Sequence, residues 1–241
     1  MRIDSSEAFV SAIIPCLDEE AAIGGLVAHL IQIGLDEVIV VDGGSRDHTV
    51  AVAKAAGARI VVEPRRGYGR ACAAGVAAVG AECQIVAFID GDGSDDPAFA
   101  PAIIGPVLRG EVDFCMGSRV RGQSEPGSLT PQQIVAGRLA GLLLWATYGV
   151  RFTDMSPFRA IRRDCLAALG MAETTYGWNL EMQMRVCARR LRLREVAVDC
   201  RRRVGGVSKV SGNFRATLPA AWSLARTFVR LAASLRGAPV N

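Results

Sequence analysis

The chain has 241 residues, of which 50% are apolar and 22% are charged, so it can bury a substantial core, and its composition excludes a disordered or collagen-like protein. No uncharged apolar run reaches the roughly 20 residues that a membrane-spanning helix needs, so the sequence predicts no such helix. The formal net charge of +4 hides an asymmetry, because residues 185–241 carry 13 basic and 2 acidic residues, whereas the first 184 residues carry 15 basic and 22 acidic ones.

The first half of the chain alternates apolar runs typical of strands with segments of helical periodicity. Residues 10–14 form a short apolar run that Pro15 ends, and apolar residues then recur at helical spacing from Ile23 to Ile31. A second unit follows, with a strand at 37–41 and a helix that runs from Asp47, its expected capping residue, through Ala56.

Two further units continue this alternation, with a strand at 59–62, a helix of small residues at 69–79 and a fully buried strand at 84–89. Strands that alternate with helices predict an α/β protein whose parallel sheet is covered by helices on both faces. The remaining predicted elements are a helix ending at Arg109, a strand at 113–116, a polar loop at 117–131, a helix to about Gly149, a helix at 178–190, a strand at 193–198 and an amphipathic helix from about Asn213 to Leu235.

Three predicted strands end in acidic or polar residues. The segment 15–19 (PCLDE) follows the first strand, 42–45 (DGGS) follows the second, and 90–93 (DGDG) follows the fourth. A single acid after a strand is commonly just a helix cap, but open α/β sheets bind ligands beyond the carboxyl ends of their strands. Three such ends together therefore predict a ligand-binding site at one edge of the sheet.

The pair Asp90-x-Asp92 predicts a cation site. Two carboxylates one residue apart at the end of a buried strand repel each other unless a cation lies between them. Oxygen ligands without histidine favour Mg²⁺ or Mn²⁺, which keep several waters and bridge to substrate phosphates. Asp95 is a further candidate ligand, whereas Asp96, which precedes Pro97, is expected to cap the next helix.

Other chemistries fit the sequence poorly. Gly67-x-Gly69-x-x-Cys72 misses the dinucleotide-binding fingerprint at its third glycine, and the chain has neither a Walker loop nor a G-x-S-x-G elbow. Its two histidines, His29 and His48, have no evident nucleophilic partner. Seven scattered cysteines without a C-x-x-C motif, and an N-terminus unlike a signal peptide, predict free buried thiols in a cytoplasmic protein.

Four segments, in order, resemble the motifs of family-2 glycosyltransferases of GT-A fold: residues 42–49 (DGGSRDHT), 90–92 (DGD), 154–159 (DMSPFR) and 203–209 (RVGGVSK). The branch that they resemble most is that of the polyprenyl-phosphate (dolichol-phosphate) mannosyl- and glucosyltransferases. The resemblance runs from about residue 10 to residue 209. It implies a GT-A catalytic domain at 1–212, with a Rossmann-like, mostly parallel sheet, followed by a C-terminal amphipathic helix and tail at 213–241.

The resemblance also implies how a nucleotide sugar would be bound. Asp42 would accept a hydrogen bond from the base, and Asp90 and Asp92 would hold Mg²⁺ or Mn²⁺ against the diphosphate. The implied donor-binding residues are Pro15, Leu17, Glu19, Asp42, Gly44, Arg70, Asp90, Gly91 and Asp92.

Basic residues supply the implied phosphate contacts. Arg203 and Lys209 would neutralise the leaving diphosphate, the acceptor phosphate or both, and Arg119 and Ser208 are the other phosphate-binding candidates. A solvated strand end is the alternative interpretation of residues 201–203. The implied catalytic set is Asp92, Asp154, Glu181, Arg203 and Lys209.

Asp154 and Glu181 are the candidates for orienting the acceptor or taking a proton. Glu181 has an alternative role, since it can pair with Arg185 one helical turn further on. A phosphate acceptor is already anionic and requires no strong base, in which case both acids only position other groups.

The resemblance thus implies an inverting, metal-dependent transfer of a hexose from a GDP- or UDP-sugar to a phosphate-bearing acceptor, with polyprenyl phosphate as the expected one. The basic C-terminal helix and the apolar run at 139–150 are expected to contact an anionic membrane surface on its cytoplasmic side, although the helix could instead pack within the protein or at a subunit contact. No nucleic-acid partner is expected, because only 6% of residues are aromatic. Transfer to a soluble acceptor, nucleotidyl transfer and a non-enzymatic nucleotide- or lipid-binding role are the alternatives, and a homo-oligomer remains open.

Overall fold

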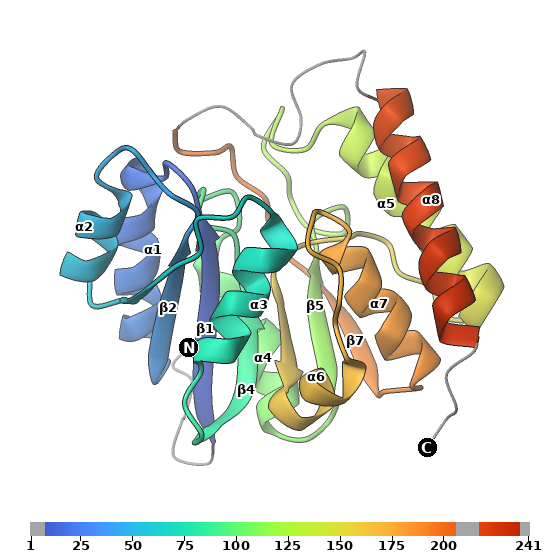
Figure 1. Ribbon diagram of the computed structural model, residues 1–241, viewed down its shortest axis with the longest axis horizontal. Helices are drawn as coiled ribbons and strands as arrows, with labels where there is room; N and C mark the ends of the chain where they lie inside the picture. Colours follow the sequence, from blue (N-terminus) through green and yellow to red (C-terminus); the bar gives the residue numbers. More distant parts are fainter. Residues whose placement is uncertain (1–7, 206–216, 237–241) are drawn as a thin grey trace.

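Seven strands form one sheet in the computed structural model, which describes residues 8–205 and 217–236 (Figure 1). In sheet order they are β3 (Arg59–Val62), β2 (Glu37–Asp42), β1 (Phe9–Cys16), β4 (Cys83–Phe88), β6 (Arg159–Arg162), β5 (Phe114–Ser118) and β7 (Leu193–Ala197). All neighbouring strands run parallel except β6, which is antiparallel to both β4 and β5. The α/β class with a mostly parallel sheet is therefore confirmed.

The helices cover both faces of this sheet (Figure 1). One apolar layer lies between the sheet and α1 (Glu20–Gln32), α2 (Thr49–Ala55) and α4 (Ala100–Leu108). The opposite layer contains side chains of α3 (Tyr68–Ala78), α5 (Pro131–Tyr148), α6 (Arg163–Leu169), α7 (Trp178–Ala188) and α8 (Thr217–Arg236). A short 3₁₀ helix, η1 (Pro97–Phe99), precedes α4.

Local sequence explains where several of these helices begin and end. Thr130 and Gln133 form a reciprocal capping box at the start of α5, and Gly149 ends that helix in the left-handed conformation, at φ 74°. Asp96 caps η1 as expected, through a 3.0 Å hydrogen bond from the N–H of Ala98. The expected cap of α2 was wrong by one residue: His48 holds that position, and Asp47 accepts from the N–H of Thr49.

Two elements of the second half, β6 and α6, were not predicted. The four residues of β6 begin and end with arginine, so the strand lacks the apolar run by which the other buried strands are recognised. Arg159 is nevertheless completely buried. The other predicted helices and strands are present with ends shifted by a few residues.

The C-terminal helix α8 packs against α7 (Figure 1), with Phe228 and Leu231 buried in the apolar layer and Val229 exposed. In the described part of the chain, no helix is long and apolar enough to cross a membrane. All seven cysteines are free, and six of them are buried, as the sequence predicts.

Candidate active site

The carboxyl ends of β1, β2 and β4 lie side by side, so the polar segments that follow these strands converge as predicted. Cys16 at the end of β1 pairs with Asp42 at the end of β2, and Ile13 of β1 pairs with Phe88 of β4. Residues 15–19, 42–46 and 90–96 therefore form one continuous rim at this edge of the sheet.

The first two segments of the rim are joined by hydrogen bonds. The N–H of Gly43 donates to the carbonyl of Cys16 at 2.8 Å, and the N–H of Asp18 donates to Oγ of Ser45 at 2.9 Å. In return, Asp18 Oδ1 accepts from the N–H of Arg46 at 2.8 Å. These bonds fix the segment that contains Pro15, Leu17 and Glu19 against the segment that contains Asp42 and Gly44.

Asp42 is buried, and its carboxylate closes its own turn. The oxygens accept from the N–H of Gly44 at 3.0 Å and from the N–H of Ser45 at 3.2 Å. Gly44 has a φ of +89°, a conformation that suits glycine, and an added Cβ there would meet no other atom within 4 Å. Asp42 thus shapes the loop in addition to the base contact implied by the resemblance.

Asp90 and Asp92 follow β4 on the other side of β1. Asp90 accepts a 2.9 Å hydrogen bond from the hydroxyl of Tyr68, and Asp92 Oδ1 accepts from the N–H of Ser94 at 2.9 Å. A Cβ on Gly91 would lie 2.3 Å from Sγ of Cys16, so only glycine allows this close approach of the two strand ends.

The two carboxylates suit a divalent cation. Burial, then the charge of Asp92 and then that of Asp95 raise the pKa of Asp90 to about 8, although the hydrogen bond from Tyr68 opposes this rise. Among the described residues, no three or more His, Cys, Asp and Glu side chains are arranged to hold a metal ion. Asp90 and Asp92 would therefore share the ion with oxygens of substrate and water, as Mg²⁺ commonly does.

Asp95 is a buried acid without a hydrogen-bond partner on either carboxylate oxygen among the described residues. Burial raises its pKa to about 6, and the charge of Arg119 opposes this rise. Its backbone forms an isolated bridge with Cys200, which ties this segment to the chain beyond β7.

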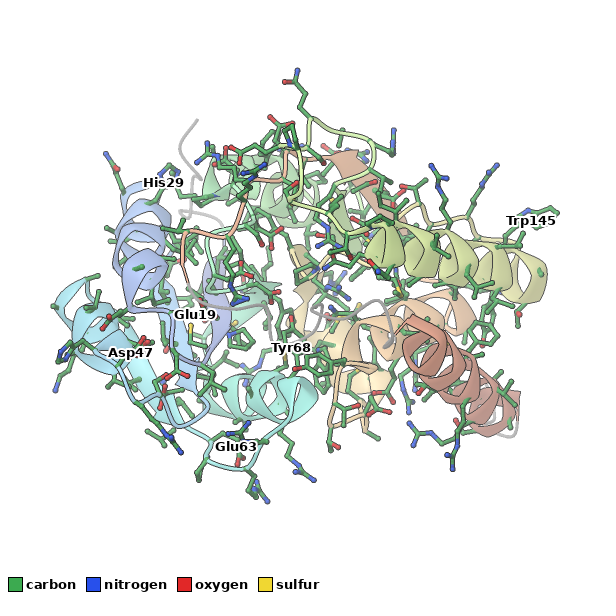
Figure 2. The ribbon with its side chains drawn as sticks, turned by 90° about the horizontal axis from the view of Figure 1, so that it is seen from above. Glu19, His29, Asp47, Glu63, Tyr68 and Trp145 are labelled. Carbon is green, nitrogen blue, oxygen red and sulfur yellow. The ribbon has the colours of Figure 1, made fainter. Side chains whose placement is uncertain are left out.

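The basic segment after β7 is held against the Asp90–Asp96 loop. The N–H of Arg201 donates to the carbonyl of Ser94 at 2.9 Å, and the N–H of Val204 donates to the carbonyl of Asp92 at 3.2 Å. Arg203 pairs with Glu19, labelled in Figure 2, and its Nη1 lies 3.6 Å from Oδ2 of Asp92. Residues Ser208 and Lys209 lie outside the described residues.

Arg119 and Asp154 form a buried, two-pronged ion pair. Arg119 Nε donates to Asp154 Oδ2 at 2.8 Å and Nη2 donates to Oδ1 at 3.0 Å, while the backbone N–H of Arg119 donates to Oδ2 in a third bond at 3.0 Å. Burial raises the pKa of Asp154, but the bonds and charge of Arg119 outweigh it and leave that pKa below its usual range. A carboxylate that is ion-paired in this way is a poor proton acceptor. This favours a role for Asp154 in positioning other groups, which was one of the two roles that the sequence left open.

Glu181 is completely buried at the start of α7 and is fully engaged in holding a neighbouring loop. It accepts from the N–H groups of Ala172 and Glu173, at 3.0 and 2.7 Å, and from Nε of Arg185 at 2.9 Å. The pairing with Arg185 that the sequence offered as an alternative is therefore present. These contacts make Glu181 a support of the loop 171–177.

The segment Gly67-Tyr68-Gly69 lies next to Asp90; from the sequence it was an incomplete dinucleotide fingerprint, and the resemblance implied that residues 66–70 lie near the base or ribose of the donor. A Cβ on Gly67 or on Gly69 would lie 2.3 Å from the carbonyl oxygen of Thr174 or of Glu173, respectively. The glycines thus allow the loop 171–177 to pack directly on the start of α3. The pair of glycines was the available signal, and it indicated close backbone approach rather than a phosphate loop. Arg70 follows on the same helix, and its N–H donates to Thr174.

Comparisons with known proteins identify the family of the chain. The family model described as "Glycosyl transferase family 2" matches residues 11–170. A glycosyltransferase of Mycobacterium tuberculosis, named as uncharacterised, is 36% identical over 211 residues, which span 87% of this chain and 93% of the relative. A dolichyl-phosphate hexose transferase of Haloferax volcanii is 31% identical over 200 residues, which span 81% of this chain and 84% of the relative.

Solved structures share the fold. The structure is similar to glucosyl-3-phosphoglycerate synthase of Mycobacterium tuberculosis in complex with Mn²⁺, uridine diphosphate and glucosyl-3-phosphoglycerate, with a TM-score of 0.71 and 25% identity. That similarity covers 98% of this chain and 82% of the synthase chain.

Proposed function

The chain belongs to glycosyl transferase family 2, and on this basis we propose that it transfers a hexose from a nucleoside diphosphate sugar to polyprenyl phosphate. The observation that carries the proposal is the meeting of the Asp90–Asp92 pair with Arg203 at the strand ends, beside the loops that follow β1 and β2. A nucleoside diphosphate sugar as the donor is supported by the similar synthase, which was solved in complex with Mn²⁺ and uridine diphosphate. Polyprenyl phosphate as the acceptor is supported by the similarity to a dolichyl-phosphate hexose transferase.

The donor would lie along the rim. The loops after β1 and β2 would take the nucleoside, and Asp90 and Asp92 would hold Mg²⁺ or Mn²⁺, which supplies Lewis-acid stabilisation of the departing diphosphate. Arg203 lies close enough to Asp92 to share in neutralising that charge.

The acceptor phosphate would be bound by Arg119, whose guanidinium Asp154 holds in a fixed orientation. A phosphate oxygen attacks the anomeric carbon as the bond from that carbon to the diphosphate oxygen breaks, and the nucleoside diphosphate leaves with the electron pair. The configuration at the anomeric carbon is inverted. The attacking oxygen is already anionic, so no residue has to act as a strong base.

A transfer assay tests the proposal directly. The purified chain, with Mn²⁺, is offered radiolabelled UDP-glucose or GDP-mannose and either polyprenyl phosphate in detergent or 3-phosphoglycerate. We expect a labelled product that partitions into organic solvent and forms only when the polyprenyl phosphate is present. A labelled water-soluble product with 3-phosphoglycerate would instead support the second candidate function, which the similar synthase favours. Absence of product in every arm would contradict both.

An exposed apolar stripe on α5 supports work at a membrane surface. Val135, Leu142 and Trp145 are each more than half exposed and recur at helical spacing, with the exposed Arg138 between them. Figure 2 shows Trp145 pointing away from the protein at the outer end of α5. Scattered exposed apolar residues are ordinary, but a stripe flanked by basic residues is typical of helices that lie in a membrane interface.

The neighbouring helix α8 adds charge to this surface. Arg226 and Arg230 of α8 are exposed, as is Val229. Leu218, Trp222, Ala225 and Val229 recur at helical spacing in this helix; Ala225 is partly exposed, and the side chains of Leu218 and Trp222 lie outside the described residues. The packing of Phe228 and Leu231 inside the protein shows that α8 uses one of its faces for the core. We propose that its exposed face and the stripe on α5 rest together on the cytoplasmic face of the membrane.

Substitution of the stripe is expected to weaken membrane binding. The variant Leu142→Glu should bind vesicles containing anionic lipid at least about tenfold more weakly than the wild type, because it replaces an exposed apolar side chain, which would enter the membrane interface, by a charge that the anionic surface repels. Flotation with such vesicles at moderate salt measures the effect. The matched control is Val62→Glu, which places the same charge on an exposed valine of the edge strand β3. Equal binding by both variants would contradict the docking surface.

A further inference from the structure

The hydrogen bond from Tyr68 to Asp90 involves a residue that the glycosyltransferase motifs in this chain do not include. We propose that Tyr68 is a positioning residue that holds the carboxylate of Asp90 in the orientation that binds the cation of the donor complex. The inference rests on the proposed function, because it assigns the support of the same cation site.

The two carboxylate oxygens of Asp90 differ in their contact with Tyr68. The Tyr68 hydroxyl donates to Oδ1 at 2.9 Å, which leaves Oδ2 as the oxygen that this bond does not engage. A carboxylate fixed through one oxygen cannot rotate freely about its last torsion, so the direction of the other oxygen is set before any ligand arrives. Groups that orient a metal ligand in this way commonly change metal affinity when they are removed.

Tyr68 is itself fixed by the loop 171–177. It is the first residue of α3, and the glycines on both sides of it pack directly on the carbonyl groups of Glu173 and Thr174. The N–H of Gly69 donates to the carbonyl of Thr175 at 3.2 Å. These contacts fix the start of α3 and, with it, Tyr68, which lies near the middle of the view in Figure 2.

The loop 171–177 is itself held by contacts with α3, α7 and α8. Glu181 of α7 accepts hydrogen bonds from two of its N–H groups. The ring of Tyr176 stacks on that of Tyr68, with ring centroids 6.3 Å apart and an interplanar angle of 22°. From α8, Arg230 pairs with Glu173. Tyr68 is therefore held in place by a connected set of contacts among α3, the loop 171–177, α7 and α8.

The test is Tyr68→Phe, which removes only the hydroxyl and keeps the half-buried ring. Mn²⁺ affinity is measured by electron paramagnetic resonance of free Mn²⁺ in the presence of UDP and, in parallel, of GDP. We expect about 10- to 100-fold weaker Mn²⁺ binding by Tyr68→Phe, with transfer restored in large part at high Mn²⁺ concentration. Tyr148→Phe, which removes a tyrosine hydroxyl at the end of α5, is the control and should bind Mn²⁺ like the wild type.

The outcomes separate this inference from the proposed function. If the wild type binds Mn²⁺ with a nucleoside diphosphate and Tyr68→Phe binds it equally well, the role of Tyr68 is overturned and the function stands. Equal weakening in both variants also overturns it, because the effect would then be general. If the wild type binds no Mn²⁺ with either nucleotide, the proposed cation site fails, and the role of Tyr68 fails with it. A purely structural role for the hydroxyl would lower the melting temperature of Tyr68→Phe without a loss that Mn²⁺ rescues.

Discussion

Replacement of Asp92 by asparagine is expected to lower sugar transfer by about a thousandfold and to leave the fold intact. The amide keeps an oxygen that can accept the hydrogen bond from the N–H of Ser94, so the loop retains its shape. It loses the negative charge on which the cation and the stabilisation of the leaving diphosphate would depend, an effect of several kcal/mol. Initial rates at saturating donor, with circular dichroism to verify the fold, measure the loss.

The control for Asp92→Asn is Asp164→Asn, the same change of charge at an exposed acid of α6. Its transfer rate should stay within about twofold of the wild type, because a single exposed charge contributes little. Removal of divalent cations by a chelator should abolish wild-type transfer, and added Mn²⁺ should restore it. Full activity of Asp92→Asn, or of the wild type after verified metal removal, would contradict the cation site.

Replacement of Arg119 by methionine is expected to destabilise the protein by about 3–5 kcal/mol, because it leaves the carboxylate of Asp154 buried without its partner. The double variant Arg119→Met/Asp154→Leu removes both charges and should recover most of this stability. It should not recover transfer, because the group proposed to bind the acceptor phosphate is still missing. Urea unfolding and transfer rates of the three proteins distinguish the two effects, and an active double variant would limit Arg119 to a structural role.

The stability added by this ion pair should depend on pH in a defined direction. The pKa of Asp154 in the folded protein lies below its usual value, so the folded state favours the ionised carboxylate. The stabilisation is therefore fully present above the unfolded-state pKa of about 4 and is lost as the pH falls through the lower, folded-state value. The difference in urea midpoint between the wild type and Arg119→Met should accordingly be constant near neutrality and shrink in acid.

Sequence patterns predicted the N-terminal half of the sheet, β1 to β4, well. The strands β1 to β4 are marked by apolar runs that end at proline, aspartate or glutamate, and such local signals need no knowledge of distant residues. The GT-A class is confirmed by the similar synthase. The strand β6 was missed because its character depends on burial between two neighbours, which a four-residue segment rich in arginine does not reveal.

The sequence predicted which strand ends form the candidate site, but not which of its side chains contact one another. The acids after β1, β2 and β4 were identified because parallel strands must end at the same edge. Arg119 and Asp154 are 35 positions apart, and Tyr68 and Asp90 are 22 apart, so no spacing rule for a helix or strand could pair them. The engagement of Glu181 with a loop that precedes it also emerges only from the tertiary structure.

The late position of β6 in the chain constrains the order in which the protein can be assembled during synthesis. The strands β1 to β4 are complete by Phe88 and pair almost entirely with one another, so a nascent chain of that length already carries the partners for one half of the sheet. The free edge of β4 then stays open until the ribosome has supplied residues 159–162, and β5 has no neighbour before that point. An exposed edge on a strand as apolar as β4 is a template for pairing with another chain. Premature termination between residues 89 and 158 should therefore yield aggregating fragments, and chaperone binding would be most useful over that interval of translation.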